Sequence, residues 1–139
     1  MGLQMLGIHI ENNENMEDLE VVKNEEYMES MEVISCQIIA ASGGAKSSYI
    51  EAIGLAKEGK FEEAEEMIKE GAKIYLQGHK AHADLLQMSA EGKLEIPLLL
   101  MHAEDQMMNC ETMKIVAEEL IAQYKKMEKM NREIELLKG

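Results

Sequence analysis

The stretch that decides the fold is FEEAEEMIKEGAKIYLQGHKAHADLLQMSA, residues 61–90. Two rows of core-type residues recur in it at a spacing of seven: Phe61, Ile68, Tyr75 and His82 in one row, and Ala64, Gly71, Gly78 and Leu85 in the other. Seven residues make about two helical turns, so both rows lie on one side of a helix. The small residues of the second row allow another backbone to approach closely. The stretch therefore predicts a long helix packed against other helices.

The flanking sequence extends this pattern on both sides. EGK at 58–60 and EGKLEIP at 91–97 are turn-like, and Pro97 suits the first turn of a following helix that reaches nearly to Gly139. A first helix is expected from about Leu19 to Lys57, with Gly43 and Gly44 marking a kink or a close packing point. One face of that helix carries core-type residues at steps of three and four: Tyr27, Met31, Ile34, Ile38, Ala41, Ala45, Tyr49, Ala52 and Ala56. The predicted fold class is all-α, an antiparallel three-helix bundle.

The third predicted helix has two apolar faces. One is a coiled-coil-like seam that is expected to face the other two helices: Met113, Leu120, Met127 and Ile134, with Val116, Met130 and Leu137 beside them. The second stripe, which contains Asp105 at its middle, is Leu98, Met101, Met108 and Ile115. Two partner helices cannot cover both faces, so we expect an oligomer in which copies of this helix meet. A buried carboxylate is unfavourable unless it is paired or binds metal, so several Asp105 side chains could share one cation.

Composition excludes several classes of partner. The 139 residues are enough for one domain, and 27 acidic residues against 14 basic ones give a net charge of −13. This charge argues against binding nucleic acid or an anionic membrane surface, and it suits basic protein partners. Thirteen Met, one Phe, one Pro and no Trp favour adaptable helix contacts over sheet.

We expect a cytoplasmic protein. No apolar run approaches the length of a membrane span, and the N-terminal sequence lacks the basic region and cleavage site of a signal peptide. Cys36 and Cys110 have no C-x-x-C spacing and are interpreted as buried, reduced thiols. Residues 1–18 are acidic and Asn-rich, and are predicted to be a flexible extension preceding a folded domain over residues 19–139.

The segment LLLMHAEDQMM, residues 98–108, sets polar groups into an apolar run. The imidazole of His102 can act as a nucleophile or base near neutral pH, and Gln106, four residues later, can reach the same face and orient the ring. The alternative is a core histidine that only hydrogen-bonds a neighbour. Helical spacing alone does not separate these two interpretations.

Three other motifs are weaker. SGGAKSS at 42–48 fails the spacing of a phosphate-binding loop, because Ala45 stands where the last glycine should be. His79 and His82 have the spacing of a metal pair, but no third ligand stands nearby, and no E-x-x-H motif of a di-iron bundle occurs. AKEGKFEEAEEMIKEGAKIY at 56–75 has the rhythm of one tetratricopeptide unit without a repeat. A helical adaptor or interaction module without chemistry therefore stays an alternative function.

LLLMHAEDQMM closely resembles the active-site helix of the IIA component of the lactose/cellobiose/chitobiose phosphotransferase system, whose motif is an apolar run followed by H-[AG]-[QE]-D-[HQ]-[LM]-M. IIAASGGAKSSYIEAIGLAKEGKFEEAEEMI and GHKAHADLL resemble the first helix, the turn and the second helix of that family. The resemblance covers about Glu32 to Lys126. Gly78, His82 and Ala83 depart from the family's usual Ala, Gln and Thr, and Gln106 stands where many members have a second histidine.

The resemblance implies a specific function. Members of the family are cytosolic homotrimers, so the resemblance implies that this chain forms a trimer of about nine main helices. A histidine, matching His102, accepts a phosphoryl group from the histidine phosphocarrier protein and passes it to a cysteine of the IIB component during uptake of a β-linked disaccharide. Three copies of a carboxylate matching Asp105 hold a divalent cation, expected to be Mg²⁺. The apolar surroundings of His102 are expected to exclude water, and the sequence does not identify the sugar.

Overall fold

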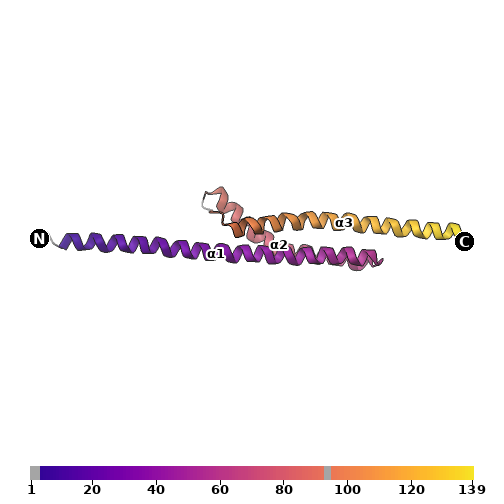
Figure 1. Ribbon diagram of the computed structural model, residues 1–139, viewed down its shortest axis with the longest axis horizontal. Coiled ribbons are helices and arrows are strands. Elements are labelled where there is room, and N and C mark those ends of the chain that lie inside the picture. Colours follow the sequence, from indigo (N-terminus) through magenta and orange to yellow (C-terminus); the bar gives the residue numbers. More distant parts are fainter. Residues whose placement is uncertain (1–3, 93–94) are drawn as a thin grey trace. The chain divides into compact units, whose positions relative to one another are not determined.

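The structure is a computed structural model that describes the backbone of residues 4–92 and 95–139, and side chains within 20–21, 23–92 and 95–139. It contains three helices, α1 (Gln4–Lys57), α2 (Phe61–Ala90) and α3 (Leu98–Lys138), and no strand in the described residues (Figure 1). The predicted all-α class and the predicted bounds of the second helix are confirmed. In that part of the chain no helix combines the length and the apolar character that a bilayer crossing requires.

The chain divides into two compact units, Met1–Val33 and Ile34–Gly139, each of which is described by itself. In the first unit α1 already begins at Gln4, well before the expected start near Leu19. The predicted flexibility of residues 1–18 stays a prediction, and residues 1–3 lie outside the described part of the chain. The second unit holds all the motifs that the sequence singled out for chemistry.

Within the second unit, the expected face of α1 forms the core. Its buried residues are Ile38, Ala41, Ala45, Tyr49, Ala52 and Ala56. Small residues of α2 let the two helices approach: a Cβ on Gly78 would lie 3.0 Å from the Ala41 Cβ, and one on Gly71 would lie 2.5 Å from Tyr49 Cε1. The predicted companion row of α2, which includes both glycines, is buried. The Tyr49 ring and the backbone of α1 fill the space that side chains at the two glycines would need.

The first turn is closed by backbone hydrogen bonds. Glu58 N and Lys60 N donate to Leu55 O at 3.1 and 3.0 Å, and Gly59 N donates to Ala56 O at 3.1 Å. Gly59 has φ of 78°, a left-handed conformation that glycine adopts without steric cost. α1 stays helical through Gly43 and Gly44, and a Cβ on Gly44 would lie 3.2 Å from Ile74 Cγ2, which makes this position a close packing point.

Two sequence expectations are wrong. The row of α3 that faces the other helices is Leu100, Ala103, Met107, Cys110, Ala117 and Ile121. Of the predicted seam, only Met113 packs partly buried against the core in the described residues, whereas Val116, Met127, Met130, Ile134 and Leu137 are exposed. Spacing alone cannot tell which of two apolar faces packs inward, because both have the helical period. Cys36 is exposed and only Cys110 is buried; burial raises the pKa of the Cys110 thiol, with Glu111 adding to the shift.

Candidate functional site

His102 lies on α3 just after the first turn of the helix. Leu100 N and Met101 N donate hydrogen bonds to Pro97 O at 3.0 and 3.2 Å, so the helix begins immediately after Pro97. The side chain of His102 is exposed, while the next residue, Ala103, is fully buried against the core. The imidazole therefore stands on a rigid helix and points away from the packed interior, which excludes the core-histidine interpretation for the single chain.

The immediate surroundings of His102 differ from the sequence expectation. Among the residues that the structure describes, no hydrogen bond joins the His102 ring to the Gln106 amide, although both lie on α3 at the expected spacing. The expected apolar enclosure is also absent in the single chain, because the ring itself is exposed and Met101 beside it is 57% exposed. Any exclusion of water from this imidazole must come from another protein surface.

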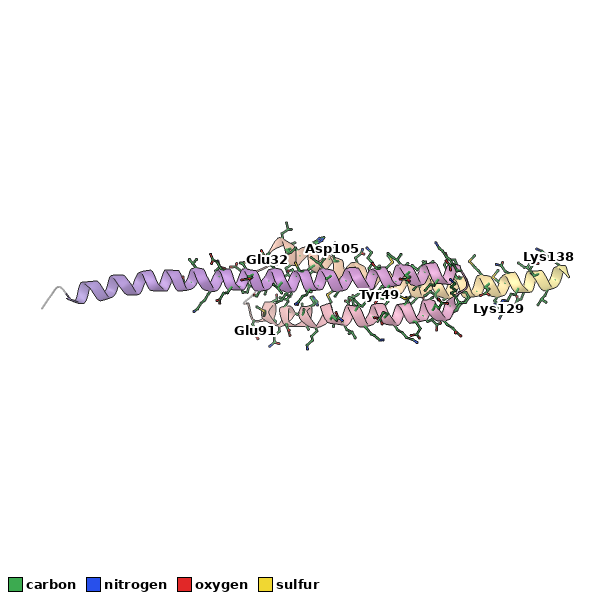
Figure 2. The ribbon with its side chains drawn as sticks, turned by 90° about the horizontal axis from the view of Figure 1, so that it is seen from below. Glu32, Tyr49, Glu91, Asp105, Lys129 and Lys138 are labelled. Atoms are coloured by element: carbon green, nitrogen blue, oxygen red, sulfur yellow. The ribbon has the colours of Figure 1, made fainter. Side chains whose placement is uncertain are left out.

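Asp105 lies on an uncovered apolar stripe of α3, which Figure 2 places on the part of the helix near its start. The side chain is exposed, and the apolar neighbours on the same face are exposed as well: Leu98, Met101, Met108 and Ile115. The predicted second stripe therefore exists and is not covered by α1 or α2. Within the described residues no group of three or more His, Cys, Asp or Glu side chains could hold a metal ion. Asp105 can therefore contribute to a metal site only together with ligands from outside the described residues.

A pair of polar groups joins α2 to α3 close to this region. His82 Nε2 lies 2.8 Å from Glu104 Oε2, and both side chains are partly buried. Glu104 is two residues after His102, and two residues turn a helix by about 200°. The pair therefore lies on the side of α3 opposite His102 and anchors that helix to α2. His79 is exposed and its ring lies near those of Tyr75 and His82. Among the described residues the two histidines belong to no group of three side chains that could hold a metal ion.

Two further polar contacts fix the middle of α3. Lys46 Nζ donates to Asn109 Oδ1 at 2.7 Å, which joins α3 to α1. The Tyr75 hydroxyl of α2 donates to the Glu111 carboxylate. Burial raises the pKa of Tyr75, and the hydrogen bond to Glu111 raises it further. Asn109 and Glu111 are exposed, so these contacts orient α3 about its axis at the edges of the core and leave the stripe that contains Asp105 uncovered.

A shallow apolar groove lies between α2 and the start of α3. It has a volume of about 320 Å³ and is lined by Leu85, Leu86, Ser89, Ile96, Leu100, Met101 and Glu104. Leu86 and Ile96 are exposed, so the groove is apolar and open. Leu100 and Glu104 each stand about 200° around α3 from His102, so the groove lies on the other side of the helix from the imidazole.

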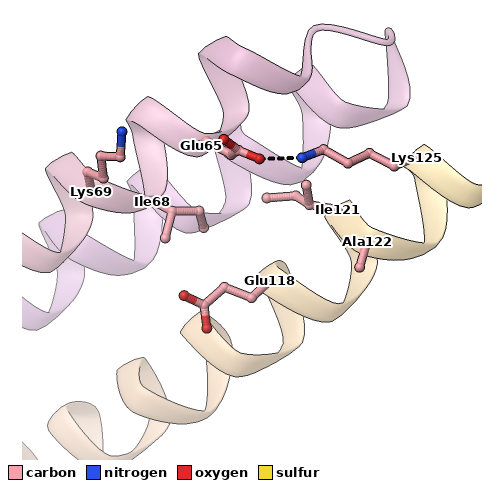
Figure 3. A pocket seen from close by; sticks show the side chains of 7 residues that line it. All are labelled: Glu65, Ile68, Lys69, Glu118, Ile121, Ala122 and Lys125. Atoms are coloured by element: carbon pink, nitrogen blue, oxygen red, sulfur yellow. Dashed lines mark hydrogen bonds and ion pairs between the residues drawn. The ribbon is translucent and has the colours of Figure 1, made fainter.

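A second groove, about 440 Å³ in volume, lies between α2 and α3 and has no part in this site (Figure 3). An ion pair between Glu65 and Lys125 bridges it, and Ile68 and Ile121 form its floor. Its nearest lining residue on α3, Glu118, is about 24 Å along the helix from His102. The groove therefore cannot hold a group that reacts with the imidazole.

Sequence reasoning missed Glu104. The residue lies inside the quoted motif, but its partner is 22 positions away on another helix. The only signal in the sequence is that His82 occupies a row that faces a neighbouring helix, which indicates contact without naming the partner. The structure was needed to join the two residues.

The chain was compared with known proteins. The family described as "PTS system, Lactose/Cellobiose specific IIA subunit" matches residues 33–125. The lichenan-specific phosphotransferase enzyme IIA component of Bacillus subtilis (strain 168) is 41% identical over 91 residues, which are 65% of this chain and 83% of that protein. The galactose-specific EIIA component of Lactococcus lactis subsp. cremoris (strain MG1363) is 37% identical over 92 residues, 66% of this chain and 79% of that protein.

The fold also matches solved structures. The crystal structure of the cellobiose-specific enzyme IIA from Bacillus anthracis aligns with a TM-score of 0.68 and 40% identity, over 70% of this chain and 91% of that one. The family match contains His102, Glu104 and Asp105 and all three segments that pack in the second unit. It excludes residues 1–32 and 126–139.

Proposed function

The chain belongs to the lactose/cellobiose-specific IIA subunit family of the phosphotransferase system, and on that premise we propose that it is a phosphoryl carrier that uses His102. It accepts the group from the histidine phosphocarrier protein in the cytoplasm and passes it to a cysteine of its cognate IIB component. The relay serves the uptake and phosphorylation of a β-linked disaccharide. The observation that carries this proposal is the exposed imidazole of His102 near the start of α3, within the matched region.

The chemistry needs no oxidant and no co-reactant. A ring nitrogen of neutral His102 attacks the phosphorus of the incoming phosphohistidine, the donor's N–P bond breaks, and its electron pair returns to the donor imidazole. In the second transfer a cysteine thiolate attacks the same phosphorus and the N–P bond on His102 breaks. The chain's part is positioning. The exposed ring admits the partner protein, and docking of that partner over the ring supplies the water exclusion that the single chain lacks.

The uncovered stripe of α3 supports the proposal of a homotrimer. Leu98 is 81% exposed and Met108 is 61% exposed, and large apolar side chains on one face of a helix are unfavourable in water. Three copies meeting along this face would bury the stripe and bring three Asp105 carboxylates together. A divalent cation, expected to be Mg²⁺ with water completing its oxygen shell, would offset the repulsion among them.

Phosphate transfer tests the assignment of His102. Incubated with phosphoenolpyruvate, its kinase and the histidine phosphocarrier protein, the chain should gain one acid-labile, base-stable phosphate. His102→Ala should gain none and stay folded, because the side chain is exposed. His79→Ala is the matched control, since it removes another exposed imidazole, and it should be labelled like the parent. Labelling that survives in His102→Ala, or that is lost in His79→Ala, would overturn the assignment. No labelling of the folded parent would favour the adaptor function.

Sedimentation tests the assembly. At micromolar concentration the parent should sediment as a trimer of the 15.7 kDa chain. A stable monomer or dimer would exclude both the trimer and the shared Asp105 site.

A further inference from the structure

The C-terminal end of α3 continues past the rest of the bundle. Near this end of the bundle α3 contacts α2 through Lys125, whose Nζ pairs with Glu65 and lies 5.8 Å from the centre of the Phe61 ring. α1 ends at Lys57 and α2 begins at Phe61, so neither helix reaches farther in this direction. Residues 126–138, called the overhang below, remain helical for about 20 Å beyond that point. Both views show it, with Lys129 and Lys138 labelled in Figure 2.

The overhang carries an apolar seam that nothing in the described chain covers. Met127, Met130, Ile134 and Leu137 are between 46% and 87% exposed. Their spacings of three, four and three residues are those of the a and d positions of a heptad, which lie on one face of a helix. An isolated helix of this length is only marginally stable in water. A second helix packed on this seam would supply the missing stabilisation.

The seam lies on the same face of α3 as the stripe around Asp105. Positions separated by five turns, about 18 residues, point in the same direction from a straight helix. Leu98, Val116 and Ile134 are related in this way, and Met101 and Leu137 are separated by twice that interval. The buried row of α3, which includes Ala103 and Ile121, lies on the opposite side. A single helical face therefore runs uncovered from the start of α3 to its end.

The charges beside the seam suit another copy of the same helix in parallel register. With Met127 at a, Glu133 occupies a g position and Lys138 the following e position, and these are the positions that pair between parallel chains. The preceding g and e residues are Lys126 and Asn131, so the register places no like charges opposite each other. Lys138 also contacts Glu135 of its own helix at 2.9 Å and is exposed. The pair between helices therefore sets register and adds little affinity.

We propose that residues 126–138 form a parallel coiled coil with the same residues of other copies of the chain, prolonging the interface along α3 beyond the family domain. The occupant of the seam is a second copy because the heptad spacing, the charge order and the continuity with the α3 stripe all fit an axis parallel to this helix. The register rests on the assembly proposed above. The overhang lies outside the family match, which ends at residue 125. The proposed coiled coil is therefore a feature of this chain beyond the shared domain.

Cysteine cross-linking of the full chain tests the proposal. Cys36 is exposed and is first replaced by Ser, while Cys110 is buried and stays. In this background Ile134→Cys should form disulfide-linked dimers under mild oxidation, because equivalent seam positions of a parallel coil lie within disulfide reach. Leu136→Cys is the matched control: it is 81% exposed and lies off the seam. It should cross-link several-fold more slowly.

A second pair of variants tests stability. Ile134→Glu should lower the melting temperature by about 5 °C or more, and Leu136→Glu should leave it unchanged. Equal cross-linking of the two cysteine variants, or a chain that stays uncross-linked, would overturn the proposal; the second result would indicate residues 1–33 or another protein as the occupant. Phosphate labelling of His102 is scored in the same samples. Cross-linking without labelling would contradict the carrier function alone, and labelling without cross-linking would contradict the coiled coil alone.

Discussion

His82 Nε2 of α2 lies 2.8 Å from Glu104 Oε2 of α3. Glu104 is the second residue after His102, so this contact anchors the turn of α3 that carries His102. The other ring nitrogen of His82, Nδ1, is buried and has no hydrogen-bond partner among the described residues. The position thus combines one strong contact with one unsatisfied nitrogen, and glutamine would keep an amide donor for the contact while replacing the imidazole that carries that nitrogen.

Replacing His82 should separate these two effects. His82→Ala removes the partner of a partly buried carboxylate and should lower the free energy of unfolding by about 1–2 kcal/mol. His82→Gln keeps a donor toward Glu104 and should be at least as stable as His82→Ala, and close to the parent. Urea unfolding measures both, with His79→Ala as the exposed control. An alanine variant as stable as the parent would show that the contact does not anchor α3.

Replacement of two glycines, each in the interior of a helix, by alanine should change the free energy of unfolding in opposite directions. Gly71→Ala places a Cβ 2.5 Å from Tyr49 Cε1 and 3.1 Å from Ala45 O, so Tyr49 must shift within the core. We expect a loss of about 1–3 kcal/mol in the free energy of unfolding. Gly54 is exposed, and a Cβ there meets no atom within 4 Å. Gly54→Ala should therefore gain up to about 1 kcal/mol. A Gly71→Ala protein of unchanged stability would contradict the packing of α2 on α1.

The raised pKa of Tyr49 predicts a loss of stability at high pH. Burial raises its pKa from 10.0 to about 12, with Cys110 and Glu118 contributing. The folded state therefore holds this proton more tightly than the unfolded state, so the stabilisation is complete below pH 10 and is lost as the pH rises from 10 to 12. Tyr49→Phe removes this contribution. The decrease in the urea midpoint between pH 9 and pH 11.5 should be smaller in Tyr49→Phe than in the parent, and equal decreases would contradict the prediction.

The proposed site at Asp105 predicts that metal binding stabilises the trimer. If three copies share a cation, removing metal with excess chelator should lower the melting temperature of the parent. Asp105→Leu removes the repulsion among carboxylates and the need for metal together. Its trimer should persist in chelator and melt at the same or a higher temperature than the untreated parent. A parent that is indifferent to chelator, together with an Asp105→Leu chain that sediments as a monomer, would contradict the shared site.

Local pattern was enough for most of the secondary structure. The bounds of α2 follow from turn-like segments on either side of a heptad pattern, and the buried face of α1 follows from steps of three and four ending at Ala56. These signals are local because side chains three and four residues apart meet on the same face of a helix whatever else the chain does. The start of α1 was misplaced, since residues 4–18 lack a clear apolar stripe but are still helical.

The motif around His102 could also be recognised from the sequence, because a histidine and an aspartate three residues apart in an apolar run resemble one known family. The sequence did not show that the side chain of His102 is exposed. Whether His102 or Ala103 points into the core depends on which of two apolar faces of α3 packs against α1 and α2. Both faces have the helical period, so the pattern left the choice open.

What the sequence by itself determined is the set of helices, their turns and the family motif that contains His102 and Asp105. What only the tertiary structure decided is the rotation of α3: the row from Leu100 to Ile121 faces inward, and Asp105, Met130 and Ile134 face outward. The physical reason is that the buried face of a helix is chosen by its contacts with the neighbouring helices and not by its own sequence alone. Cross-helix contacts such as those of His82 with Glu104 and of Lys46 with Asn109 select one face of α3, and those partners are far apart along the chain.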